Sequence, residues 1–275
     1  MKFIFSTILT LLFAFSSHGQ YWFGPKVGIS YIDHVYQDRT YEKDSFDVKQ
    51  DLNFQAGIAF NYTASDMYSV YAELLYEKVD KTVKDKSSGG ELVNASMTNH
   101  FLSAPVMLRV TLGKVPFHYY VNAGPRLSYW LGGKGSLFLD EFNENPPIMD
   151  DDGNPLPVEY KTTFNSDKAL DGDRGTALVS KPNRLQFGLT AGGGMYFDLA
   201  NGTRLQVDLR YTWVHSNMGT NNGVQDINFA GENYRENFEY YHNIATIGIA
   251  YLFNYDANLK RKGSSTSKES KKRKK

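Results

Sequence analysis

The sequence predicts an all-β fold, an eight-stranded antiparallel up-and-down transmembrane β-barrel with long external loops. Three observations predict it: apolar and polar residues alternate through about eight segments, several segments reach about ten residues, and short and long connections follow one another in turn. Alternation with period two gives a strand one apolar and one polar face. A bilayer requires about ten tilted residues per strand, whereas strands of soluble proteins average about five or six.

The predicted strands are the segments 26–32, 52–62, 68–78, 101–112, 117–131, 185–199, 203–213 and 242–253. The segment TRLQVDLRYTW shows the alternation most clearly, and its apolar face is predicted to meet lipid. That face consists of Leu205, Val207, Leu209, Tyr211 and Trp213. In a soluble sandwich the same face would be the core, so the alternation alone leaves both folds open.

The connections between the segments distinguish the two folds. The short connections ASD, GKV and ANG are typical of tight hairpin turns. The connections between them are long and polar, at roughly 37–51, 84–94, 132–183 and 216–239. A barrel with turns on one rim and loops on the other produces this pattern, and aromatic residues at strand ends match the girdles of membrane barrels.

The amino-terminal segment predicts export. Met1–Gly19 contains Lys2, an apolar run and the small residues that a signal peptidase requires, so we interpret it as a cleaved signal peptide. The run is shorter than the roughly 20 residues that a membrane helix needs. The predicted organisation is a signal peptide at 1–19, an outer-membrane barrel at 20–256 and a basic, disordered periplasmic tail at 257–275.

Composition excludes several functions. The chain has no Cys, which rules out disulfides, thiolate metal sites and a lipid anchor on Cys. Its 30 Lys and Arg balance 30 Asp and Glu, so no nucleic-acid partner is predicted. The aromatic and glycine content, with 19 Tyr, 18 Phe and 24 Gly, favours an all-β chain.

The polar strand faces are predicted to fill the barrel interior. A barrel of about eight strands is just wide enough for side chains to fill, and buried charges need partners. The hypothesis is an internal charge network in which three carboxylates meet three guanidinium groups. These residues are Glu73, Glu77, Asp208, Arg109, Arg126 and Arg210. We therefore expect a plugged cylinder, and the alternative is a passive or selective, porin-like channel.

The connection 132–183 is rich in carboxylates and invites a metal interpretation. Asp150, Asp152 and Asn154 have the spacing that opens a calcium loop. However, Pro155 replaces the required glycine and Lys161 stands where the bidentate Glu belongs, so no metal site is predicted. A looser divalent-ion contact that bridges lipopolysaccharide stays open, and we expect this loop to bind partners outside the cell.

The carboxy-terminal tail is basic and rich in Ser. Its cations include Lys260, Arg261, Lys271, Arg273 and Lys275. In the periplasm such a tail would be attracted to anionic headgroups, cell-wall polymer or an acidic partner, or would be a solvated appendage.

No catalytic site and no cofactor are predicted, and the chain is not expected to be an enzyme. His215 and His242 lie near the predicted outer rim and would approach each other across adjacent strands. Such a pair suits a metal ion or acid–base chemistry, so a rim enzyme is the third hypothesis.

Several stretches resemble the PorT-like outer-membrane β-barrel family. They are GPKVGISY, FLSAPVMLRVTLGKVPFHYYVNAGPRLSYWLGG, GLTAGGGMYFDLANGTRLQVDLRYTWVHSNM and IATIGIAYLF. The resemblance implies an eight-stranded barrel in the outer membrane of a Gram-negative envelope, and the family's namesake is tied to type IX protein secretion. The expected function is a structural or accessory envelope protein. Its expected partners are outer-membrane lipid, lipopolysaccharide and envelope or secretion proteins. The barrel itself is expected to be monomeric. The third long loop and the tail depart from a plain member.

Overall fold

The computed structural model describes residues 20–37, 46–86, 93–139, 157–164, 176–179, 181–199, 202–219, 225–227 and 238–255. None of these residues belongs to a helix long and apolar enough to cross a membrane.

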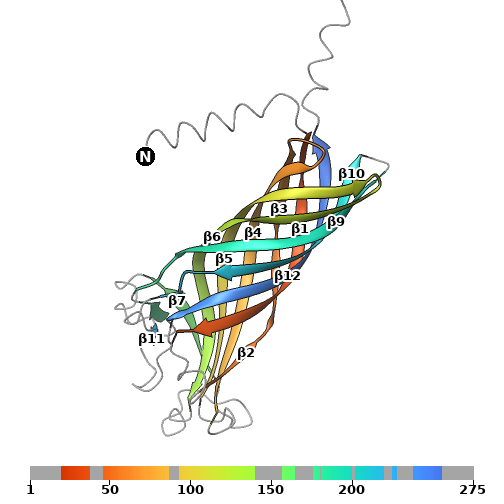
Figure 1. Cartoon of the computed structure of the whole chain (residues 1–275). Helices are drawn as coiled ribbons and strands as arrows, with labels where there is room; N and C mark the ends of the chain where they lie inside the picture. Colours follow the sequence, from red (N-terminus) through yellow and green to blue (C-terminus); the bar gives the residue numbers. More distant parts are fainter. Residues whose placement is uncertain are drawn as a thin grey trace, which may run out of the picture.

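Eight antiparallel strands form a closed ring (Figure 1). They are β1 (Gln20–Tyr36), β3 (Leu52–Thr63), β4 (Tyr68–Asp85), β5 (Val93–Lys114), β6 (Phe117–Leu139), β9 (Leu185–Asp198), β10 (Thr203–Val214) and β12 (Tyr240–Tyr255). The first and last strands close the ring along their whole length, from Tyr21 opposite Tyr255 to Tyr36 opposite Tyr240. The predicted fold class is confirmed, and each predicted segment lies in one of these strands except for Leu199, which directly follows β9.

The three predicted tight turns lie together at one end of the barrel, the turn end. Between β3 and β4, the backbone N–H groups of Ala64 and Ser65 both donate to the carbonyl of Tyr68. Between β9 and β10, Leu199 donates to the Thr203 carbonyl at 2.8 Å, and Gly202 adopts φ +74, which favours glycine. The opposite end, which carries the long connections, is the loop end.

Residue exposure alternates along every strand of the ring. On β10 the residues Arg204, Gln206, Asp208 and Arg210 are buried, while the residues between them face outward. The outward positions of all eight strands form a continuous belt of exposed apolar and aromatic side chains. The barrel is therefore apolar outside and polar inside, the reverse of a soluble domain.

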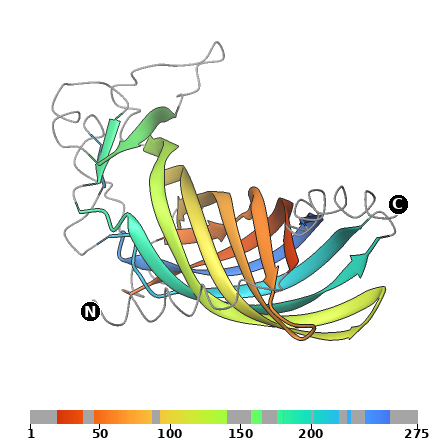
Figure 2. The ribbon, with the colours of Figure 1, turned by 90° about the horizontal axis from the view of Figure 1, so that it is seen from above.

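Four shorter strands extend the wall at the loop end: β2 (Phe46–Gln50), β7 (Val158–Thr163), β8 (Thr176–Val179) and β11 (Gln225–Ile227). β2 pairs with β4, β7 with β6, β8 in parallel with β7, and β11 with β8. In Figure 2, β7 stands to one side of the curved wall.

These strands correct the expectation that the connections 37–51, 132–183 and 216–239 are loops throughout. A small second core stabilises them, and it consists of Val83, Ala95, Leu137, Tyr160 and Ala177. The few apolar residues of these connections lie within mostly polar sequence, so the core was not predicted.

Candidate functional site in the barrel interior

Four buried charges meet at the centre of the barrel: Lys26 on β1, Glu73 on β4, and Asp208 and Arg210 on β10. The Nζ atom of Lys26 lies 2.8 Å from Oε1 of Glu73 and 2.5 Å from Oδ2 of Asp208. Arg210 donates from Nη1 to Oε2 of Glu73 at 2.7 Å. Its Nε lies 2.9 Å from Oδ1 of Asp208, a contact without hydrogen-bond alignment. We name these four residues the central ion cluster. Two cations share two carboxylates, so its net charge is zero, which limits the cost of burial.

Inward-facing glycines make room for the central ion cluster. Gly28 and Gly248 lie opposite each other on β1 and β12. A Cβ atom on Gly248 would lie 2.8 Å from Cε of Lys26 and 3.1 Å from Oδ1 of Asp208, and one on Gly192 would lie 2.6 Å from Cγ of Arg210. The glycine content of these strands therefore provides the volume that the long charged side chains occupy.

A second buried ion pair, between Glu77 and Arg126, lies toward the loop end. The hydroxyl of Ser103 donates to Oε2 of Glu77 at 2.8 Å, and Nε of Arg126 donates to Oγ of Ser128 at 3.0 Å. Both side chains are nearly buried, and the serines complete their hydrogen bonding.

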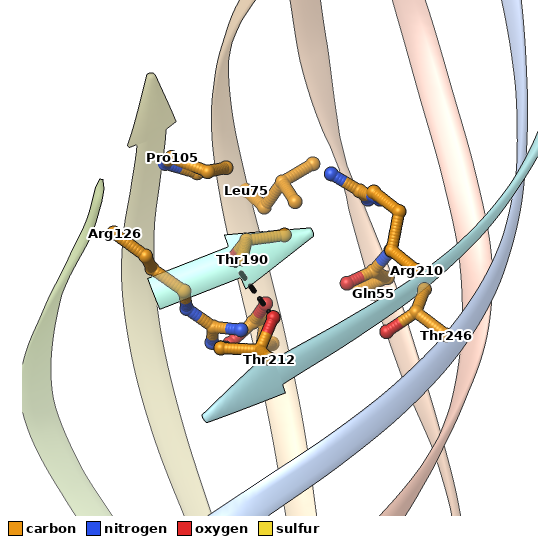
Figure 3. A pocket seen from close by; sticks show the side chains of 9 residues that line it. Gln55, Leu75, Pro105, Arg126, Thr190, Arg210, Thr212 and Thr246 are labelled. Carbon is orange, nitrogen blue, oxygen red and sulfur yellow. Dashed lines mark hydrogen bonds and ion pairs between the residues drawn. The ribbon is translucent and has the colours of Figure 1, made fainter. Parts of the chain in front are cut away.

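A small cavity lies between the two clusters, with room for no more than about one water molecule. Arg126 and Arg210 approach it from opposite sides in Figure 3, with Thr190 and Thr212 between them. The two threonine hydroxyls share a hydrogen bond of 2.9 Å. This polar space is the feature of the interior that most resembles part of a conduit.

Arg109 departs from the expected charge network. Its guanidinium lies between two aromatic rings, 3.8 Å from the centre of Tyr71 and 3.9 Å from that of Tyr120. Nη1 donates to Oε1 of Gln206 at 3.0 Å, and no carboxylate of the described residues forms an ion pair with it. The nearby Asp208 is already engaged by Lys26 and by Nε2 of Gln206, so cation–π contacts replace the ion pair.

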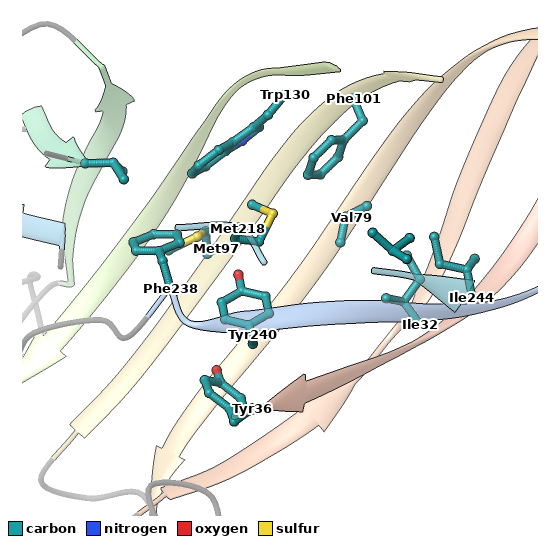
Figure 4. Packing of buried hydrophobic residues seen from close by; sticks show 12 residues of the cluster. Ile32, Tyr36, Val79, Met97, Phe101, Trp130, Met218, Phe238, Tyr240 and Ile244 are labelled. Atoms are coloured by element: carbon teal, nitrogen blue, oxygen red, sulfur yellow. The ribbon is translucent and has the colours of Figure 1, made fainter. Parts of the chain in front are cut away.

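An aromatic plug closes the barrel at the loop end, and we define it as Tyr36, Phe101, Trp130, Phe238 and Tyr240 (Figure 4). Trp130 is fully buried, stacks on Phe101 with ring centres 6.3 Å apart, and lies 5.6 Å from Phe238. Its Nε1 donates to Oδ1 of Asn99 at 3.1 Å.

The turn end is closed by a second stack. The Arg204 guanidinium lies between the rings of Trp22 and Tyr196, at 4.0 and 3.7 Å from their centres. Its Nε donates to Oδ1 of Asp198 at 2.8 Å, and the ring of His118 stacks on Tyr196. The interior is thus filled at both mouths and at its centre.

The expected approach of His215 to His242 is wrong. His242 faces inward and lies beside His34, with ring centres 5.0 Å apart, whereas His215 is exposed on the outer face. Alternation causes the difference, because Val214 is the inward residue at that level of β10. No group of three or more His, Cys, Asp or Glu in the described part of the chain has the arrangement of a metal site.

All five predicted lipid-facing residues lie on the outer face of β10, where Leu209 is 62% exposed and Trp213 48%. They belong to the apolar belt, which on β4, β5 and β6 ends toward the loop end at Tyr76, Leu102 and Leu131. We treat the strand segments within this belt as membrane-spanning.

Some predictions fall outside the described residues. They concern the signal peptide 1–19, the loop residues Asp150, Asp152 and Asn154, and the tail residues Lys260, Arg261, Lys271, Arg273 and Lys275.

The expected charge network did not include Lys26, although the alternation in 26–32 puts this residue on the polar face with Gly28 and Ser30. A signal was present, because Lys26 is the single charged residue of an otherwise apolar and small strand, 26–32. A lone charge on an inward face requires a partner.

The sequence model of the family described as outer membrane protein beta-barrel domain matches residues 15–216. Among curated proteins no match is found. The solved structures similar to this chain include the outer membrane protein OprG of Pseudomonas aeruginosa, with 13% identity, a TM-score of 0.45, and coverage of 87% of this chain and 96% of that one.

Two further similar structures have lower TM-scores. The attachment invasion locus protein Ail of Yersinia pestis, in complex with the heparin analogue sucrose octasulfate, has 10% identity, a TM-score of 0.34, and coverage of 85% and 99%. The outer membrane protease OmpT of Escherichia coli has 10% identity, a TM-score of 0.39, and coverage of 86% and 96%. At such identities the likeness does not extend to function. The family match covers most of the chain, which therefore belongs to the outer membrane protein beta-barrel domain family and lies in the outer membrane.

Proposed function

We propose that this barrel is a closed, non-enzymatic envelope protein that acts through its extracellular surface and its basic tail, as a structural or accessory component. The observation that carries the proposal is the filled interior. The aromatic plug, the central ion cluster and the Arg204 stack occupy the loop end, the centre and the turn end in succession. A solute would have to displace all three layers.

Two further considerations support the proposal. In membrane barrels the longer loops face outside and the short turns face the periplasm, so the extra strands β2, β7, β8 and β11 form an extracellular platform. The resemblance to the PorT-like family favours a partner in protein secretion, with type IX secretion as the finer proposal.

The proposal is tested by a mild-detergent pull-down of the tagged full chain from native outer membranes, with mass spectrometry of the complex. We expect secretion or other envelope proteins to be recovered. Deletion of Lys260–Lys275 is the test variant. The matched control is a tail of unchanged length with its basic residues changed to Gln, which separates the charge of the tail from its length. If the barrel is recovered alone from both wild type and variants, the accessory role is wrong.

A porin-like channel is the second candidate, favoured by the polar cavity between Arg126 and Arg210. Planar-bilayer recordings of the reconstituted chain distinguish the two. We expect no unitary conductance from the wild type and none from Glu73→Ala, which weakens the central ion cluster but leaves both mouths filled. A steady conductance in the wild type would establish the channel.

A further inference from the structure

Basic residues form an arc on the outer wall, directly beyond the apolar belt at the loop end. The arc crosses β4, β5, β6 and β7 and ends just before β9. Its members are Lys78, His100, Lys134, Lys161 and Arg184. Lys78, Lys134 and Lys161 are exposed, and the other two are half-buried. Among the described residues, the acids beside the arc are Asp80, which pairs with Lys78 at 2.7 Å, and Glu159 on β7.

The strand register brings the arc residues together. Lys78 lies opposite His100, and Lys134 lies directly opposite Lys161. Like charges facing each other across a strand pair destabilise a sheet. Neither lysine forms an ion pair with a carboxylate of the described residues, so no salt bridge among these residues offsets the repulsion.

Arg184 is held in place without an ion pair to any carboxylate in the part of the chain that the structure describes. Its guanidinium lies 4.6 Å from the ring centre of Tyr129 and 4.5 Å from that of Phe164, and its Nε donates to the Trp130 carbonyl at 3.1 Å. The ring contacts fix the planar group, and its terminal nitrogens donate no hydrogen bond to the described residues. A fixed guanidinium of this kind suits the bidentate recognition of a phosphate group.

The positive charges of the arc act on His100, which lies among them. It lies beyond the belt, and its Nδ1 shares a hydrogen bond of 2.7 Å with the hydroxyl of Tyr76. Partial burial lowers the pKa of His100, and the charges of Lys134 and Lys78 lower it further. Opposite it lies Gly132, where an added Cβ would meet no atom within 4 Å, so the wall is open at Gly132.

The arc lies at the level of the lipid headgroups, where the anion that a basic side chain meets is a lipid phosphate. The last exposed apolar residues below it on β4, β5 and β6 are Tyr76, Leu102 and Leu131, and Tyr129 is exposed two residues before Leu131. Aromatic residues at a barrel rim lie at headgroup level, and basic side chains there meet lipid phosphates. The long-loop end faces the outer leaflet.

We propose that the basic arc binds the phosphorylated glucosamine headgroup of an outer-leaflet lipid of the lipopolysaccharide type, with Arg184, Lys134 and Lys161 as the phosphate donors. The proposal concerns the outer wall and is independent of whether the interior conducts.

The test uses the full chain in dodecyl maltoside micelles and diphosphoryl lipid A as the probe. Lys134→Gln/Lys161→Gln is the test variant, and Lys49→Gln/Lys84→Gln, on the outward face of β2 and β4 farther from the belt, is the matched control. A charge-assisted hydrogen bond is worth about 1.5–3 kcal/mol, so we expect the test variant to bind lipid A at least about tenfold more weakly. The control should bind like the wild type.

Two further probes identify the source of the phosphate. Lipid A treated to remove its phosphates should bind much more weakly than diphosphoryl lipid A. Inorganic phosphate at millimolar concentration should not displace lipid A. Equal binding of the dephosphorylated lipid, equal loss in the control variant, or displacement by inorganic phosphate would each overturn the proposal.

Stability without lipid separates a binding defect from a folding defect. Because the repulsion between Lys134 and Lys161 is removed, the test variant should melt at the same temperature as the wild type or higher. A second variant, Arg184→Lys, keeps the charge but loses the planar fork, and we expect it to weaken lipid A binding. Unchanged lipid A affinity in both variants would exclude the arc as the site.

Discussion

Glu73 connects the two cations of the central ion cluster, so its neutralisation should destabilise the barrel strongly. In Glu73→Gln the side chain keeps its shape but loses its charge. Lys26 and Arg210 then share Asp208 alone, and one buried positive charge has no counterion. Removal of one partner from a buried ion pair costs about 3–5 kcal/mol. We expect about 3 kcal/mol, because Asp208 still contacts both cations.

A double variant tests whether uncompensated charge is the cause. Lys26→Met/Glu73→Gln leaves Arg210 and Asp208 as a balanced pair, and a methionine occupies the volume of the lysine. Replacing a buried pair by groups of similar volume is often neutral or stabilising. The double variant should therefore be more stable than Glu73→Gln by about 2 kcal/mol, within the range that coupled neighbours show.

The assay is reversible urea unfolding of the full chain in phospholipid vesicles, followed by tryptophan fluorescence. A surface substitution on β2, Lys49→Gln, is the control and should change the free energy of unfolding by less than about 0.5 kcal/mol. If Glu73→Gln falls within that same limit, or if the double variant is no more stable than Glu73→Gln, the cluster does not stabilise the barrel as described.

The other predictions concern space, backbone and the aromatic plug. Gly248→Val should cost about 1–3 kcal/mol in the same unfolding assay, because its side chain would displace Lys26 from its two carboxylates; an unchanged midpoint would show that the interior has spare volume. Gly202→Ala, where φ is +74 and no atom lies within 4 Å, should cost about 1 kcal/mol through backbone strain alone. Trp130→Ala should cost about 3–5 kcal/mol by leaving a cavity in the plug, yet liposome-swelling rates should stay at the wild-type value because the central ion cluster still closes the barrel.

The alternation of side chains made most of the fold predictable. In β10 each inward and outward position follows from the sequence alone, because a strand has two faces and a barrel wall assigns one to each environment. The short strands β2 and β7 were not predicted. Their few apolar residues, such as Phe46 and Tyr160, are too short a series to show a period within polar sequence.

The sequence predicts which charged residues face the interior, but it does not predict which of them form ion pairs with one another. Glu73, Asp208 and Arg210 were expected to pair, and they lie within ion-pair distance. Which cation each carboxylate meets depends on strand stagger around the ring, which the sequence does not give. Arg109 illustrates this, because it was expected to meet a carboxylate and instead lies between two tyrosines.

The histidines show that closeness in strand register does not by itself bring two side chains together. His215 and His242 are near each other along the wall, but the wall separates them because one faces out and the other in. Proximity in register therefore has to be combined with the face of the strand before two side chains are assigned to one site.

Charged residues of the interior and of the outer wall differ in how they are paired, and this difference indicates different roles. Inside, the Lys26 and Arg210 cations are matched by carboxylates, and glycines on the facing strands leave them room, which is the pattern of a structural cluster. On the outer wall, Lys134 and Lys161 face each other without an ion pair to any carboxylate of the described residues, and such like-charge pairing costs stability. An arrangement that weakens the isolated protein is understandable if an anion from the surrounding leaflet completes it. The outer rim, not the lumen, is therefore where we expect a ligand.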